Sequence, residues 1–128
     1  MKTMILLLAL AASSVQAQAQ DGKTMFAKNC AACHQASGAG IPGAFPALKG
    51  NALAQGDPAI VVATVLKGRA GMPAFAASLD DEKLSAIITY VRSAWGNKAG
   101  PITTADVASV RQAASAASVA KETGTIIH

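Results

Sequence analysis

Hydrophobic and polar residues alternate most regularly in the stretch that follows Asp80. Its apolar members recur at the three- and four-residue steps of one helix face: Leu84, Ile87, Ile88, Val91 and Trp95. Asp80 suits an N-cap, and the two acidic residues after it would lie in a first helical turn, where negative charge is favourable. The pattern therefore predicts an amphipathic helix that begins after Asp80 and turns one apolar face to a core.

A second helix is predicted near the start of the chain, over residues 22–32. Gly22 and Phe26 lie four residues apart, so a small residue and an aromatic one share a face and allow another helix to approach closely. We expect this helix to cross the one after Asp80 at that point, with Tyr90 or Trp95 in the contact.

Residues 59–66 are strongly apolar and β-branched, which would also suit a strand. Their flanks favour a helix, because Asp57 is a good N-cap, Pro58 suits the first turn and Gly68 suits the position after the last turn. Residues 35–51, by contrast, lose the helical period and are rich in Gly and Pro, so they predict a loop.

A break at residues 96–101 precedes a fourth predicted helix. Thr103-Thr104-Ala105-Asp106 resembles a capping box, and the helix would run to about Lys121 with a weakly apolar face formed by Val107, Val110, Ala114 and Ala117. The sequence leaves open whether it packs on the domain, needs a partner or frays, and residues 123–128 are expected to be a disordered end. The predicted fold class is all-α, with three core helices and a C-terminal extra helix.

The first residues have the features of a secretory signal peptide. Lys2 gives a positive start, residues 4–12 are apolar but too few to span a bilayer, and Ala17-Gln18-Ala19 offers a cleavage site after Ala19 or Ala17. We therefore expect an exported, periplasmic protein with no membrane span after cleavage. The expected division of the chain is a signal peptide (1–19), one domain (20–97) and a helical extension with a tail (98–128).

Composition limits the class of protein further. The chain has 128 residues, which suits one domain, and a formal net charge of +4. Its basic residues form no cluster and are not interleaved with aromatic residues, so the sequence does not favour nucleic-acid binding.

The most informative motif is Cys30-Ala31-Ala32-Cys33-His34, a C-x-x-C-H sequence typical of c-type haem attachment. Residues three apart on a helical turn share a face, so both cysteines can form thioethers with one macrocycle. His34 follows directly and is the candidate axial iron ligand. Covalent haem c, one per chain, is the predicted cofactor.

Three other chemistries could use this cysteine pair. A thioredoxin-like dithiol needs a βαβ context that the sequence does not show, and a structural zinc site needs further ligands, whereas the only other histidine is His128. A plain disulfide in an exported protein stays open.

Two further residues complete the predicted haem site. A ligating histidine usually donates its second ring N–H to a carbonyl, for which Pro46 is the first candidate and Pro42 the second. Of the methionines after the signal peptide, Met25 lies on the first helix and suits the core, whereas Met72 lies in a Gly/Pro-rich segment. Met72 is therefore the predicted second axial ligand.

The chain resembles class I cytochromes c over about residues 21–96, through the C-x-x-C-H motif, Pro46-Ala-Leu48, Met72-Pro73 and the helix ending Tyr90-Val-Arg-Ser-Ala-Trp95-Gly. The resemblance implies a small helical fold around one haem c with His/Met ligation. A narrower likeness concerns the haem domains of cytochrome subunits that serve periplasmic alcohol and sugar-acid dehydrogenases. Those subunits often carry three such domains, whereas this chain has one motif and no repeat.

These features predict an electron-transfer protein and not an enzyme. Its iron would cycle between Fe(III) and Fe(II), linking a periplasmic dehydrogenase or respiratory donor to a terminal oxidase or reductase. Lys67 and Arg69 are candidates to pair with a haem propionate or an acidic partner. The expected state is a monomer or a subunit of a dehydrogenase complex. Two alternative functions stay open: a haem-bearing subunit held in such a complex by residues 101–121, and a ligand-binding or catalytic haem protein with a labile methionine.

Overall fold

A computed structural model describes residues 21–124 of the chain, and the predicted signal peptide (1–19) lies outside them. The described residues form helices and loops with two isolated β-bridges and no strand. The helices span residues 21–29, α2 (Ala31–His34), α3 (Pro58–Lys67), α4 (Asp81–Ser93) and α5 (Thr104–Gly124). The all-α class predicted from the sequence is confirmed.

Helix α4 forms the centre of the domain, and its apolar face is the predicted one. Asp80 accepts a hydrogen bond from the Lys83 backbone N–H at 2.9 Å, and the buried hydrophobic side chains are Leu84, Ile87, Ile88 and Val91. The helix ends at Ser93, so the predicted continuation of its face to Trp95 is wrong. The backbone is extended at Ala94, and Trp95 has φ 55°, so its ring reaches the core from beyond the helix.

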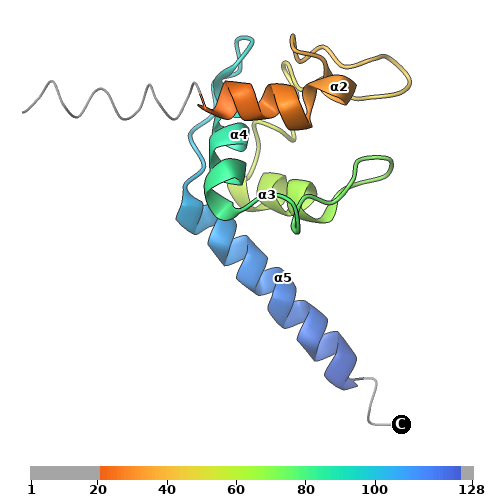
Figure 1. The fold of residues 1–128 in the computed structure, drawn as a ribbon, viewed down its shortest axis with the longest axis vertical. Helices are drawn as coiled ribbons and strands as arrows, with labels where there is room; N and C mark the ends of the chain where they lie inside the picture. The colour runs from red at the N-terminus through yellow and green to blue at the C-terminus, as the bar shows by residue number, and fades with distance from the viewer. Residues whose placement is uncertain (1–20, 125–128) are drawn as a thin grey trace, which may run out of the picture.

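The first helix crosses α4 where the sequence predicted (Figure 1). A Cβ on Gly22 would lie 2.3 Å from the Ala86 carbonyl oxygen, so the two backbones approach as closely as glycine allows. The Phe26 ring is 2% exposed and lies 5.5 Å from the Tyr90 ring and 5.3 Å from the Trp95 ring. Both aromatic candidates therefore take part in the contact.

The first helix does not run unbroken to residue 32 as predicted. Cys30 has φ −127° and ψ −32°, outside helical geometry, and α2 begins after it. The carbonyl of Cys30 accepts the backbone N–H groups of Cys33 (3.2 Å) and His34 (2.9 Å). The break thus starts a separate helical turn that carries Cys33 and His34.

The ambiguous apolar segment after residue 57 is a helix, as its flanking residues predicted. The Asp57 carboxylate accepts hydrogen bonds from the N–H groups of Ala59 (2.8 Å) and Ile60 (3.3 Å), and α3 ends before Gly68. Its buried side chains are Val61, Val62 and Leu66.

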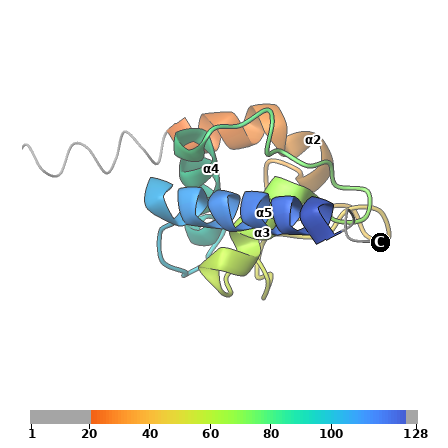
Figure 2. The same cartoon turned by 90° about the horizontal axis from the view of Figure 1, so that it is seen from below.

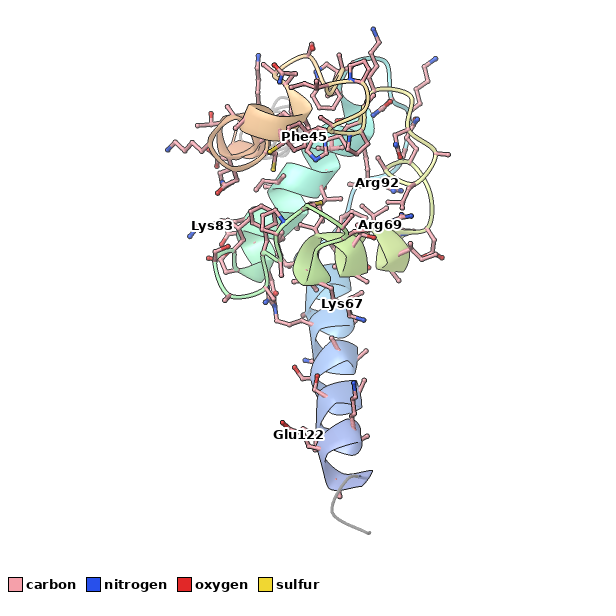
Figure 3. All side chains as sticks on the ribbon, turned by 90° about the vertical axis from the view of Figure 1, so that its right-hand side faces the viewer. Phe45, Lys67, Arg69, Lys83, Arg92 and Glu122 are labelled. Atoms are coloured by element: carbon pink, nitrogen blue, oxygen red, sulfur yellow. The ribbon has the colours of Figure 1, made fainter. Side chains whose placement is uncertain are left out.

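The C-terminal helix α5 begins at the predicted capping box. Thr103 and Asp106 exchange backbone-to-side-chain hydrogen bonds of 2.8 and 3.1 Å, and Val107 is fully buried. The first part of α5 packs on α3 and α4, whereas residues 115–124 are all exposed. Figures 1 and 3 show this far part extending away from the domain, and Figure 2 shows α5 lying across α3. The helix continues to Gly124, so residues 123 and 124 are helical and not part of a disordered tail.

A buried arginine connects α4 to two loops. Arg92 is 5% exposed, and its guanidinium donates to the carbonyl oxygens of Ala54 (3.0 Å), Gly56 (2.9 Å) and Gly100 (2.7 Å). The charge is therefore compensated by backbone dipoles. Across residues 21–124 there is no helix whose length and apolar content would let it cross a membrane.

The crossing at Gly22 yields a stability prediction. In an ordinary exposed helix position, Gly→Ala stabilises the protein, but here the new methyl group would collide with the backbone of α4. We expect Gly22→Ala to lower the free energy of unfolding by about 1–3 kcal/mol, measured by thermal or denaturant unfolding of the haem-loaded protein.

The matched control is Gly100→Ala, because a Cβ at Gly100 would meet nothing within 4 Å. Its unfolding midpoint should stay within a degree or two of the wild-type value. Equal midpoints for the two variants would contradict the close crossing.

Candidate functional site

The predicted attachment residues lie together on α2 and at its N-cap. His34 is the last residue of this helix and is only 8% exposed, while Cys30 and Cys33 are half-buried. Cys30 and Cys33 are not joined in a disulfide, so the disulfide alternative is not what the structure contains. Residues 21–124 also contain no group of three or more His, Cys, Asp or Glu side chains that could hold a metal ion.

The orientation of the His34 ring is set by a backbone carbonyl twelve residues further along the chain. His34 Nδ1 lies 2.9 Å from the Pro46 carbonyl oxygen, so the acceptor is that of Pro46 and not Pro42. A carbonyl oxygen only accepts, so Nδ1 must carry the ring proton. In the neutral ring Nε2 then keeps its lone pair, which is the form in which a histidine ligates a metal.

The loop that supplies this carbonyl is closed by its own hydrogen bonds. The Gly40 N–H donates to the His34 carbonyl (2.9 Å), and Ile41 and Phe45 exchange two bonds of 2.8 Å. Gly40 has φ +64°, and a Cβ there would lie 2.6 Å from the Pro46 carbonyl oxygen. Only glycine lets the Pro46 carbonyl pass this close to the His34 turn.

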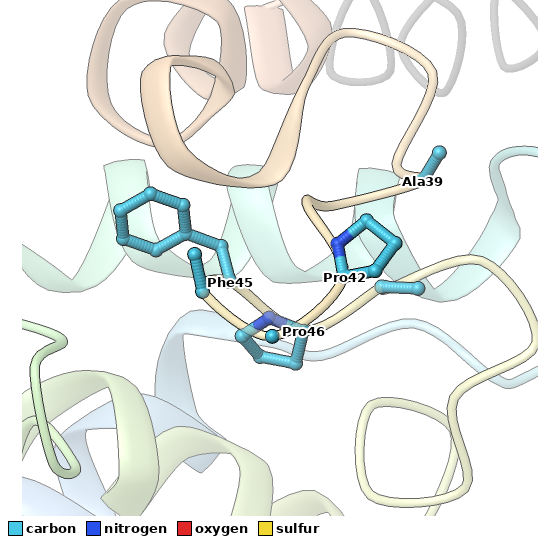
Figure 4. A pocket seen from close by; sticks show the side chains of 7 residues that line it. Ala39, Pro42, Phe45 and Pro46 are labelled. Atoms are coloured by element: carbon cyan, nitrogen blue, oxygen red, sulfur yellow. The ribbon is translucent and has the colours of Figure 1, made fainter.

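The outer side of this loop is apolar. Figure 4 shows Pro42, Phe45 and Pro46 lining a shallow pocket together with Ala39, and the Phe45 side chain is 37% exposed. The residues from Ala39 to Ala47 that line this pocket carry no charged group.

Two residues beyond α4 hold the same loop from the other side. The Trp95 indole N–H donates to the Ala36 carbonyl at 3.0 Å. Asn97 is 5% exposed, donates to the Leu48 carbonyl at 3.1 Å and accepts the Gly50 N–H at 2.8 Å. Reasoning from the sequence did not assign these roles, because the partners are backbone groups about fifty residues away.

Met72 lies in the loop after α3, as predicted. It is half-buried and exchanges two backbone hydrogen bonds with Arg69, of 2.9 and 3.2 Å, which close a tight turn. Met25 lies on the first helix and packs against the hydrophobic core. Figure 1 shows α2 and the loop after α3 projecting to the same side of α4. Ligation by Met72 remains a prediction.

The surroundings of Cys30 keep its thiol neutral. Burial, and then the neighbouring Cys33, raises the pKa of the Cys30 thiol to about 11. The thiol is therefore protonated at neutral pH, unlike the thiolate of a redox-active dithiol. Near Met72, the charged residues Lys67 and Arg69 are exposed, and Figure 3 shows both beside α3.

Comparison with known proteins identifies the relatives of this site. Residues 17–91 match the family described as cytochrome c oxidase, cbb3-type, subunit III. The chain is 41% identical over 93 residues to the cbb3-type cytochrome c oxidase subunit CcoP of Azospirillum brasilense, an alignment covering 67% of this chain and 32% of that protein.

Two relatives of other kinds are also similar. The cytochrome c subunit of the quinone alcohol dehydrogenase of Gluconacetobacter polyoxogenes is 31% identical over 103 residues, which cover 70% of this chain and 22% of that subunit. Cytochrome c-552 of Thermus thermophilus is 34% identical over 93 residues, covering 60% of this chain and 70% of that protein. The chain thus spans about a third or less of the oxidase and dehydrogenase subunits.

These similarities and the C-x-x-C-H motif show that the cofactor is covalently bound haem c. The geometry fits this group. Cys30 and Cys33, which are not joined in a disulfide, adjoin the buried His34 imidazole whose Nδ1 faces the Pro46 carbonyl, and the described residues provide this donor set in one short turn.

The close passage at Gly40 yields a prediction about the His34 ring. Ala at either Gly40 or Gly43 must adopt positive φ, at a cost of about 1–2 kcal/mol, but only at Gly40 would the methyl group also collide with the Pro46 carbonyl. We expect Gly40→Ala to displace that carbonyl and weaken the His34 hydrogen bond. The measurement is solvent exchange of the His34 Nδ1–H by NMR, which should become faster.

Gly43→Ala is the matched control, because its φ is +78° and a Cβ would meet nothing within 4 Å. It should lower stability while leaving that exchange rate at the wild-type value. Equal exchange rates in both variants would show that Gly40 does not determine the position of the carbonyl.

Proposed function

The chain belongs to the c-type cytochrome family described as cytochrome c oxidase, cbb3-type, subunit III, and on that premise we propose that it carries single electrons between redox proteins. Haem c supplies the chemistry, a one-electron change between Fe(III) and Fe(II). The protein supplies attachment through Cys30 and Cys33 and axial ligands from His34 and Met72. In this proposal the chain is a carrier and not an enzyme.

The hydrogen bond between His34 Nδ1 and the Pro46 carbonyl is the observation that carries the proposal. It fixes the tautomer, holds the ring in one orientation and raises the basicity of Nε2. A ligand held in this way moves little when the iron changes charge, which keeps the reorganisation on electron transfer small.

Ligation by Met72 is supported by its place in the chain. It lies in a turn that Arg69 closes, whereas Met25 lies on the first helix among core residues. With His34 and Met72 both bound to the iron, the protein would leave no position for a substrate, and the haem would supply electron transfer only. Lys67 and Arg69, both exposed beside this turn, are proposed to face a haem propionate or an acidic partner.

The proposed setting is the periplasm, with a signal peptide at residues 1–19, a haem domain at 20–97 and an extension at 98–128. Partners would be a dehydrogenase or respiratory donor and a terminal oxidase or reductase. The relatives support this range, since they include a subunit of an oxidase and a subunit of an alcohol dehydrogenase.

A second candidate is a haem-bearing subunit of a dehydrogenase complex. The exposed far part of α5 favours it, because a helix of this composition gains little stability by itself in water. Purification from the native host would distinguish the two, since a free carrier elutes at its monomer mass whereas a subunit elutes with the dehydrogenase.

Optical spectra test the proposal through the two methionines. The wild-type ferric protein should show the weak far-red absorption band that a methionine thioether bound to haem iron produces, and the reduced protein should not bind CO. Met72→Ala should abolish the band and allow CO to bind, whereas Met25→Ala should keep the band and exclude CO. A wild-type protein that binds CO stoichiometrically at neutral pH would favour the alternative of a ligand-binding haem protein.

A further inference from the structure

Arg111 connects α5 to the segment that follows the Met72 turn. Its guanidinium donates to the Asp81 carboxylate (2.8 Å), the Ala76 carbonyl (2.6 Å) and the Leu79 carbonyl (2.9 Å). The Arg111 and Asp81 side chains are 29% and 35% exposed, so the ion pair is partly shielded from water. One planar group thus contacts three points within six residues of chain.

The segment held by Arg111 is the direct continuation of the Met72 turn. On its inner side, the Phe75 N–H donates to the Val65 carbonyl (3.1 Å), and the Ala76 N–H donates to the Leu66 carbonyl (3.2 Å). The residue Ala76 is therefore held by α3 through its N–H and by α5 through its carbonyl. Met72 lies four residues before it.

Neither α4 nor α5 needs Arg111 to cap its N-terminus. Helix α4 has Asp80 as N-cap, and α5 has the Thr103–Asp106 capping box and the buried Val107. The guanidinium even lies near the N-terminus of α4, where the helix dipole disfavours a positive charge. The two hydrogen bonds to Ala76 and Leu79 fix the path of residues 76–79, and the third joins the guanidinium to the start of α4.

We infer that Arg111 is a positioning residue that keeps the Met72 thioether in place by holding the chain that follows it. The inference rests on the proposed ligation by Met72. Loss of the guanidinium would free residues 76–79 from α5 while leaving the thioether attachments and the His34–Pro46 contact untouched. The population with an open sixth position would then rise.

Imidazole binding to the ferric protein measures that population, because the apparent affinity is the intrinsic affinity scaled by the open fraction. In full-length, haem-loaded protein, we expect Arg111→Ala to tighten apparent imidazole binding by about tenfold, as expected for the loss of hydrogen bonds to a charged group. The far-red band should weaken, and the reduction potential should fall because thioether ligation raises it.

Val107→Ala is the matched control, because it removes a fully buried contact of α5 but leaves the Arg111 hydrogen bonds in place. It should lower the unfolding temperature without changing imidazole affinity. Arg111→Lys, which keeps the charge but not the planar fork, should give an intermediate affinity and serves as the test variant if Arg111→Ala does not fold.

Equal affinities for the Arg111 variants and wild type would overturn the inference, as would equal effects of Val107→Ala and Arg111→Ala. A wild-type protein without the far-red band would overturn Met72 ligation, and this inference with it. A wild-type protein with the band, and an Arg111→Ala variant with unchanged imidazole affinity, would overturn the inference alone.

Discussion

The hydrogen bond from His34 Nδ1 to the Pro46 carbonyl is the constraint on which the site depends. It brings together two points of the chain that the loop of residues 35–45 would otherwise separate, and it leaves Nε2 as the ring nitrogen for the proposed iron ligation. Gly40 is the residue that makes room for it. The buried imidazole, the cysteine pair beside it and the matched family all agree on covalent haem as the group that this turn holds.

The loops around this site are held by one kind of contact, in which a polar side chain donates a hydrogen bond to a backbone carbonyl oxygen. Arg92, Asn97, Trp95 and Arg111 each donate to main-chain oxygens of a loop outside the helices. A small helical domain with few aromatic residues has a limited core, so these contacts give its long loops a defined course. The family match ends at residue 91, yet all four side chains come from residues 92–111.

Local patterns in the sequence predicted most of this architecture. The caps at Asp57, Asp80 and Thr103, and the crossing at Gly22, depend on residues close together or on the size of one side chain, so they could be inferred in advance. The break at Cys30 and the early end of α4 could not, because they follow from backbone angles that tertiary contacts impose. The Pro46 acceptor was predicted from the chemistry of a ligating histidine. The Arg111 contacts could not be predicted, because no pattern in the neighbouring sequence indicates them.

The long reach of the contacts from Trp95 and Asn97 bears on the order in which the protein folds. These bonds join residues 59 and 49 positions apart, and the crossing at Gly22 spans a similar stretch. Closing such long loops costs conformational entropy before the contacts form. We therefore expect these contacts to slow the folding of a domain that is otherwise rich in helix. The bonds from Trp95 and Asn97 to the loop after His34 can therefore form only after most of the domain has been synthesised, so until then the chain that carries the cysteine motif lacks these two anchors.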